Sequence, residues 1–267
     1  MESQFHQLLR QIESAAQSAL RKSFEFEEIG SFCAYFDPLS DLIWLNYATP
    51  VKPISDGAAF RVAMGSLRAE FAERRRRLRF EFIQALWPEL PKMLLSEGLV
   101  LQAEQPLMIC SGESFQKRDA NNVEIRELHS NDDDCLLEIY QRTAAEGFAA
   151  NMESTEESRR RLRVELRSDA RRCVIGFVAG EPAGVAALSP MGQTAELVGV
   201  ATLPRFRRRG VASALSSYLL AGHFARGKSA TWLSANDAIA QSVYRGLGFV
   251  DAGIYANYIA PETAPPA

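Results

Sequence analysis

The chain has 267 residues, 47% hydrophobic and 24% charged, which is enough apolar material for one large or two small cores. The net charge of −3 disfavours a surface that is tuned as a whole to nucleic acid or anionic lipid. No stretch reaches the roughly 18 uncharged apolar residues of a membrane helix, and no basic flank leads into an apolar core at the start. The four cysteines stand far apart, with no Cys-x-x-Cys pair and no neighbouring histidine. We therefore expect a cytoplasmic protein without a metal site.

The N-terminal half contains an apolar strand that ends at Tyr47-Ala48-Thr49. A helix follows, because apolar residues recur there at helical spacing, at Phe60, Met64, Leu67 and Phe71. In MLLSEGLV, Gly98 ends a second helix and opens a strand, which predicts a left-handed C-cap. A charged run and an Asn pair then precede the alternating VEIREL, so we place a domain boundary between residues 118 and 119.

The C-terminal half predicts alternating strands and helices. The hairpin signal is strong, because two apolar runs flank GEP. The predicted elements are a strand at 123–128, helices at 132–147 and 153–169, a hairpin at 173–190, a strand at 194–202, a helix ending near 226, a strand at 229–235, a helix ending near LGF, and a last strand at 251–260. This order indicates an α/β protein with a mixed sheet, in which residues 119–260 form the second domain and 261–267 a disordered tail.

The two halves resemble each other weakly. Thr49 and Thr202 both end an apolar strand, and Gly98 and Gly248 both end a helix and open a strand at comparable distances further on. Each half has a helix and another strand in between. We interpret this as an internal duplication with a degenerate copy over residues 1–118, against the alternative that two unrelated α/β halves align by chance.

The stretch RFRRRGVASAL follows the strand that ends at Thr202. A backbone phosphate site needs free N–H groups at a helix N-terminus and small residues beside them, which Gly210 and Ala212 supply. Arginines at a helix N-terminus oppose the helix dipole unless an anion neutralises both. The pattern favours a phosphate-bearing ligand, with a solvated basic face as the alternative.

This stretch resembles the signature loop of the GNAT superfamily of N-acetyltransferases, which is Gln or Arg, two residues, Gly, one residue, and Gly or Ala. The preceding LVGVATLP and the closing helix with RGLGF match the family as well. The resemblance implies a GNAT-like acyl-CoA N-acyltransferase fold with acetyl-CoA as co-substrate. The N-terminal half resembles a degenerate copy without the loop, since VKPISDG follows its strand and Leu94 takes the place of Tyr244.

By the same resemblance, the strand end contacts the pantetheine arm of CoA and the loop binds the pyrophosphate. A further pantetheine contact falls near Asn236, although the matching position holds Asp237. The residues implied in cofactor binding are Val200, Ala201, Thr202, Arg207, Arg208, Arg209, Gly210, Val211, Ala212, Ser213 and Asn236.

Two residues are candidates for the chemistry. Glu196 has the spacing of the general base in histone-acetylating family members, and a carboxylate can take the proton of an attacking amine. The alternative is a solvated glutamate at a strand end. Tyr244 corresponds to the family's general acid, which protonates the departing thiolate. The alternative is a core tyrosine on the apolar face of its helix.

The first functional hypothesis is an N-acetyltransferase that transfers acetyl from acetyl-CoA directly to a primary amine of a small molecule or peptide. The second is a catalytically silent acyl-CoA-binding regulatory or scaffold protein. A third, a nucleic-acid-binding module, would use the three arginine runs, which the acidic net charge disfavours. We expect no nucleic-acid or membrane partner, and either a monomer, as a pseudo-dimer of its two halves, or a homodimer.

Overall fold

A computed structural model describes residues 4–38, 40–54, 56–119, 122–151 and 153–262. The chain divides into two compact units. Unit 1 comprises Met1–Leu107 and Ala252–Ala267, and unit 2 comprises Met108–Asp251. Of the predicted tail at 261–267, residues 263–267 lie outside the described residues.

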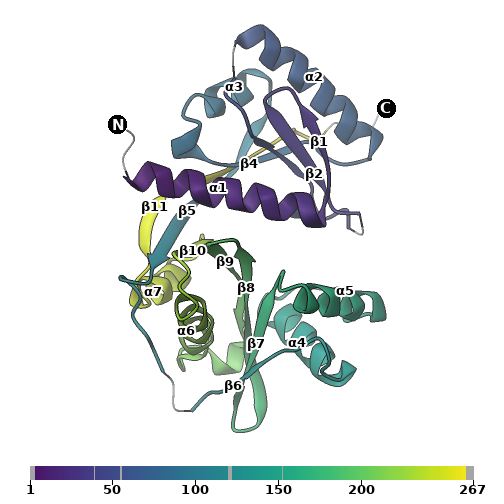
Figure 1. Ribbon diagram of the computed structural model, residues 1–267. Helices are drawn as coiled ribbons and strands as arrows, with labels where there is room; N and C mark the ends of the chain where they lie inside the picture. Colours follow the sequence, from purple (N-terminus) through teal and green to yellow (C-terminus); the bar gives the residue numbers. More distant parts are fainter. Residues whose placement is uncertain (1–3, 39, 55, 120–121, 152, 263–267) are drawn as a thin grey trace. The chain divides into compact units, whose positions relative to one another are not determined.

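Unit 1 is built on a mixed sheet with the strand order β1-β2-β3-β4-β11-β5 (Figure 1). β1 and β2 form an antiparallel hairpin, β3 pairs with β4 in parallel, and β11 pairs with β4 antiparallel. The elements are α1 (Gln4–Ser23), β1 (Glu25–Ile29), β2 (Phe32–Phe36), η1 (Ile43–Leu45), β3 (Tyr47–Pro50), α2 (Gly57–Glu73), β4 (Arg79–Ile83), η2 (Gln84–Leu86), α3 (Leu90–Ser96), β5 (Val100–Ser111) and β11 (Val250–Ile259).

Both faces of the unit 1 sheet are covered. The predicted helix residues Phe60, Met64, Leu67 and Phe71 of α2 pack with Leu94 of α3 on one side of the sheet. On the other side, Cys33, Tyr35 and Tyr47 form a smaller cluster with Leu20 of α1 and with Phe24, which follows α1. Alternate strand residues therefore face opposite layers, as the two-residue period of a strand requires.

Unit 2 has the strand order β5-β10-β9-β8-β7-β6, with the last part of β5 as one edge. β9 and β10 are parallel, whereas β6 to β9 are joined by antiparallel pairings. The elements are β6 (Glu124–Glu127), α4 (Asp134–Gly147), α5 (Glu156–Arg167), β7 (Arg172–Val178), β8 (Glu181–Met191), β9 (Thr194–Thr202), η3 (Pro204–Phe206), α6 (Val211–Phe224), β10 (Ala230–Ser234) and α7 (Ala238–Gly246).

The unit 2 sheet also separates two layers (Figure 1). Val174 and Ala186 face a core that includes α6 residues Leu215 and Leu219. Their neighbours in the strands face the second core, which α4 and α5 close with residues such as Leu137 and Leu162. Units 1 and 2 thus share one arrangement, a mixed sheet between helical layers.

The domain division differs from the predicted boundary at 118/119. Along the chain, unit 1 ends at Leu107 and unit 2 begins at Met108. Most of the predicted last strand of the second domain belongs to unit 1. The reason is long-range pairing, because Tyr255–Ile259 in β11 align with Ile83–Arg79 in β4. β5 conversely supplies an edge strand to unit 2 through residues 108–111.

The ends of α3 and α7 support the duplication. Gly98 and Gly248 both have positive φ, at 79° and 95°, as the predicted left-handed C-caps require. After α3 the Leu99 N–H donates to the Leu94 carbonyl, and after α7 the Phe249 N–H donates to the Tyr244 carbonyl. Leu94 and Tyr244 therefore occupy equivalent positions, as the sequence predicts.

Candidate acyl-CoA site

The two central parallel strands of unit 2 separate part-way along their length. β10 pairs with β9 at Ala230, Thr231 and Trp232, and the last aligned pair is Trp232 with Glu196. Beyond this pair, β9 continues to Thr202 while β10 ends at Ser234. The strands open at the point where Val200, Ala201 and Thr202 are predicted to contact a pantetheine arm.

A bulge in β9 lies in the same stretch. Between the pairs Ala187 with Val198 and Val185 with Ala201, β9 advances three residues while β8 advances two. Gly199 takes the extra position with a φ of 61°, a conformation that a glycine adopts without steric cost. Sequence reasoning missed this feature, although a glycine inside a predicted strand is a recognised signal of a bulge.

Small residues pack closely around the end of β9. A Cβ atom on Gly184 would lie 2.6 Å from the Ala201 carbonyl oxygen, and one on Gly147 would lie 2.8 Å from the Ala201 Cβ. The Thr202 hydroxyl is buried and has no hydrogen-bond partner in the described part of the chain. The end of β9 is therefore fixed by contacts on both sides of the sheet.

The loop after β9 leads into an uncapped helix. Gly210 is the N-cap of α6 with a φ of 80°, and among the described residues no side chain caps the first-turn amides. Val211 is buried and anchors the helix, whereas Ala212 and Ser213 are half-buried. The N–H groups of this first turn are the donors that a phosphate binds at a helix N-terminus.

The arginines of the loop have different surroundings. Arg205 is exposed and pairs with Glu146 at 3.3 Å and Glu181 at 3.5 Å. Arg207 donates to the carbonyls of Thr202 and Gly147, each at 3.3 Å, and so ties the loop to β9 and α4. Arg208 and Arg209 are exposed beside Gly210. Arg205 thus fits a solvated face, while Arg208 and Arg209 are the cations next to the helix N-terminus.

Glu196 lies at the last aligned pair before the two strands separate, opposite Trp232 on one side and Ser189 on the other. Its side chain is half-buried. It is therefore in the interior of β9, which disfavours the alternative of a solvated strand end. A carboxylate at this point can receive a proton from a group bound in the opening.

Tyr244 lies in the α6 side core of unit 2, with 8% of its surface exposed. Its ring packs edge-on against Phe249, with centroids 5.8 Å apart. Burial, with a smaller contribution from the Asp237 charge, raises the pKa of Tyr244 to about 12. The hydroxyl keeps its proton at neutral pH, as a general acid must, while its packing is that of the alternative core tyrosine.

Asp237, which stands where the family resemblance implies an asparagine, has a structural role. This residue is the N-cap of α7, where its carboxylate accepts from the N–H groups of Ile239 and Ala240. Asn236 precedes the cap and is exposed. Aspartate and asparagine cap a helix about equally well, so Asp237 fills a structural role that an asparagine would also fill.

The fold and this site define a class of α/β proteins in which a mixed sheet opens between two parallel strands, next to an uncapped helix. Residues 134–249 match the family model described as "Acetyltransferase (GNAT) family". This segment therefore carries a GNAT domain. The match supports an acyltransferase that takes its acyl group from an acyl-CoA.

Solved structures show the same fold over nearly the whole chain. A GCN5-related N-acetyltransferase from Kribbella flavida has a TM-score of 0.79 at 20% identity and covers 96% of each chain. One from Sphaerobacter thermophilus has a TM-score of 0.66 at 15% identity, covering 94% of this chain and 90% of that one. A tandem GNAT protein from the clavulanic acid biosynthesis pathway has a TM-score of 0.62 at 11% identity, covering 88% and 80%. No curated protein matches the chain.

The described residues provide neither a cluster of metal ligands nor a membrane-spanning helix. Among the residues that the structure describes, no group of three or more His, Cys, Asp or Glu side chains could hold a metal ion. Within the same residues, no helix is long and apolar enough to cross a membrane.

Proposed function

We propose that unit 2 is an N-acetyltransferase that transfers acetyl from acetyl-CoA directly to a primary amine, and that unit 1 is a degenerate copy that does not hold CoA. The observation that carries the proposal is the separation of β9 from β10 at Glu196, followed directly by the uncapped N-terminus of α6. The strand opening suits the pantetheine arm, and the helix N-terminus suits the pyrophosphate.

The residues present fit this ligand. A glycine with positive φ and the small Ala212 leave room for the phosphates, while Arg208 and Arg209 add positive charge. Val200, Ala201 and Thr202 offer backbone groups to the pantetheine amides. Asn236 would contact the same arm from the start of α7.

The chemistry follows from the same placement. Acetyl-CoA, when bound, supplies the thioester carbonyl that the amine attacks. Glu196 accepts the proton of the amine as the new C–N bond forms, and Tyr244 donates its proton to the sulfur as the C–S bond breaks. Backbone N–H groups at the β9 bulge stabilise the negative charge that develops on the carbonyl oxygen.

A silent acyl-CoA-binding protein is the second candidate, and one observation favours it. Tyr244 is buried among Leu247, Phe249 and other core residues, as a tyrosine without a catalytic role would be. This candidate predicts stabilisation by acetyl-CoA without turnover of any amine.

The nucleic-acid hypothesis has less support. Arg74 contacts Glu70 and Glu25, and Arg77 contacts Glu262. In the second run, Arg160 contacts Glu157 and Arg161 contacts Glu165. Arginines paired with carboxylates are less available to phosphates.

All four cysteines lie in the described chain as free thiols, which supports a cytoplasmic location as part of the proposal.

The proposed function is tested by a screen of primary amines that measures free thiol released from acetyl-CoA. We expect at least one amine to raise thiol release well above the rate of acetyl-CoA hydrolysis, and mass spectrometry to find the acetylated amine. Stabilisation by acetyl-CoA with no turnover across small amines and peptides would favour the silent binder. No stabilisation at millimolar acetyl-CoA would contradict both candidates.

A further inference from the structure

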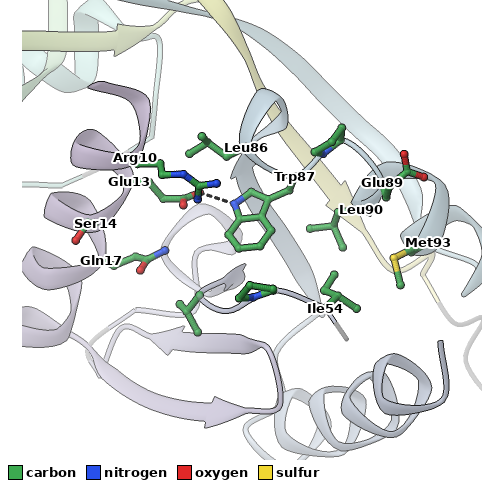
Figure 2. A pocket seen from close by; sticks show the side chains of 13 residues that line it. Arg10, Glu13, Ser14, Gln17, Ile54, Leu86, Trp87, Glu89, Leu90 and Met93 are labelled. Atoms are coloured by element: carbon green, nitrogen blue, oxygen red, sulfur yellow. Dashed lines mark hydrogen bonds between the residues drawn. The ribbon is translucent and has the colours of Figure 1, made fainter. Parts of the chain in front are cut away.

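Unit 1 contains a cavity of about 540 Å³ that the predicted function does not use. α1 lines one side with Arg10, Glu13 and Gln17, and the segment around Trp87 with the start of α3 lines the other (Figure 2). Ile54, from the loop after β3, contributes a further wall. The volume is that of a site for a small organic molecule.

The cavity lies at the unit 1 counterpart of the acyl-CoA site. Apart from the residues of α1, its lining follows β3 and β4, which are the equivalents of β9 and β10. β3 and β4 also separate, because only Ala48 and Phe80 are aligned between them. The duplicated sheet has therefore kept an opening between its parallel strands.

The helix that follows this opening, α2, lacks the free N-terminal amides that the phosphates of CoA would need. Asp56 caps α2, where its Oδ1 accepts from the N–H groups of Ala58 and Ala59, each at 2.8 Å. The carboxylate occupies the donors that a phosphate would need and adds a negative charge beside them. The features near this opening therefore disfavour a phosphate-bearing ligand.

The polar centre of the cavity is the Glu13 carboxylate, which is hydrogen-bonded to the indole of Trp87. The Trp87 Nε1–H donates to Glu13 Oε1 at 2.7 Å, so the carboxylate and the aromatic ring are held together (Figure 2). One hydrogen bond leaves a carboxylate with further acceptor capacity. The walls around the pair are largely apolar and include Leu86, Leu90 and Met93.

The charges of the lining favour a cation. Arg10 on α1 and Glu89 before α3 are both exposed and of opposite sign, whereas Glu13 is half-buried. When Glu13 is ionised, the two carboxylates outnumber the one guanidinium, so the net charge of these three groups is negative, and the Glu13 carboxylate lies beside an aromatic ring. A protonated amine can form a charge-assisted hydrogen bond with the carboxylate and a cation–π interaction with the face of the indole.

We propose that this cavity of unit 1 is a binding site for a small molecule that joins an aromatic or aliphatic apolar body to one protonated amine, with the ammonium on Glu13 and the body against Trp87, Leu90 and Met93. The site is independent of the acetyl transfer proposed for unit 2. It lies wholly within unit 1 and needs no CoA.

The proposal predicts a dependence on pH. Burial raises the pKa of Glu13 to about 7, and the Trp87 hydrogen bond and the Arg10 charge act in the opposite direction. Arg10 from α1 and Glu89 from the opposite side are the other charged groups of the lining. Because only the ionised carboxylate attracts an ammonium, affinity for the amine rises from pH 5.5 to pH 8.

The test uses the indole N–H signals of the ¹⁵N-labelled full chain, which has three tryptophans. Trp87→Phe identifies the Trp87 signal, and Trp232 reports on unit 2 in the same spectra. The probe is 2-phenylethylamine, and its control is 2-phenylethanol, which replaces the ammonium with a hydroxyl. At pH 8 we expect the amine to move the Trp87 signal and to bind at least tenfold more tightly than the alcohol.

Glu13→Gln keeps an acceptor for the indole and removes the charge, so we expect it to reduce the preference for the amine below about twofold. Glu73→Gln, an exposed α2 residue outside the cavity, should retain the preference. The wild-type chain provides a second measurement, since its preference should fall at least threefold at pH 5.5. An unmoved Trp87 signal, equal binding of amine and alcohol at pH 8, or a preference that persists in Glu13→Gln would overturn the proposal.

Discussion

Helices α2 and α6 follow equivalent strands in the two units, but their N-termini are built differently. α2 begins at an aspartate that bonds two backbone amides, and α6 begins at a left-handed glycine with no side-chain cap. The first arrangement completes the helix with the protein's own carboxylate, and the second leaves its amides to an external anion. The residues that follow β3 thus form a purely structural helix end, whereas those that follow β9 form a candidate phosphate site.

The largest expected effect concerns turnover in unit 2. Glu196→Gln removes the proposed base while keeping the size of the side chain, so we expect kcat to fall by about 10² to 10⁴. Affinity for acetyl-CoA should stay within about twofold of the wild type. Steady-state kinetics with the best amine, together with calorimetric titration of acetyl-CoA, measure both.

Tyr244→Phe is the companion variant for the proposed acid. Its ring packing is retained, so a loss of kcat without a loss of stability would assign the hydroxyl to the chemistry. If both substitutions leave turnover unchanged, the assignment of base and acid is wrong and the core interpretation of Tyr244 stands.

The second effect concerns cofactor binding. Gly210→Glu places bulk and negative charge at the N-terminus of α6, and we expect acetyl-CoA to bind about 100-fold more weakly, or about 2.7 kcal/mol. Arg205→Ala is the matched control, because Arg205 is engaged with Glu146 and Glu181. If calorimetry shows equal losses of acetyl-CoA affinity in the two variants, RFRRRGVASAL is better interpreted as a solvated basic face.

The third effect concerns the titration of Glu13 in unit 1. The raised pKa of Glu13 means that the folded state binds this proton more tightly than the unfolded state. Stability is therefore lost as pH rises from 4.5 towards 7, by about 1 to 2 kcal/mol once partial exposure of the side chain is taken into account.

Denaturant unfolding of wild type and Glu13→Gln at pH 5 and pH 8 measures this loss. Relative to the wild type, the free energy of unfolding of Glu13→Gln should be higher at pH 8 than at pH 5. A difference that does not vary with pH would show that Glu13 titrates at its ordinary pKa.

The smallest effect concerns the cap of α2. Asp56→Ala removes an acceptor of two backbone N–H groups and should lower the free energy of unfolding by about 1 kcal/mol. Asp237→Ala, which removes a cap of the same kind from α7, should cost a similar amount. A cost near zero for Asp56→Ala alone would mean that other groups satisfy the start of α2.

Local patterns predicted most of unit 2 but not the pairing between distant segments. The predicted strands and helices over residues 123–250 lie within three residues of the observed ones, because hairpin and helix periodicities are local. The helix α1 and the β1–β2 hairpin were not predicted. Nor was the transfer of β11 to unit 1, since its pairing with β4 joins residues far apart in the chain.

The sites show the same limit. The loop at Gly210 is contiguous, so its spacing alone predicts an uncapped helix start. The Gly199 bulge had a local signal that was overlooked. The Glu13–Trp87 contact joins residues 74 positions apart, and no periodicity links a residue of α1 to one that precedes α3.

Of the two duplicated openings, we propose that one holds CoA. Calorimetric titration of the full chain with acetyl-CoA tests it most directly through the stoichiometry. We predict one acetyl-CoA per chain, with binding lost in Gly210→Glu and unchanged in Asp56→Ala and Glu13→Gln. Two equivalents per chain, or one that persists in Gly210→Glu and disappears on changes in unit 1, would contradict the account.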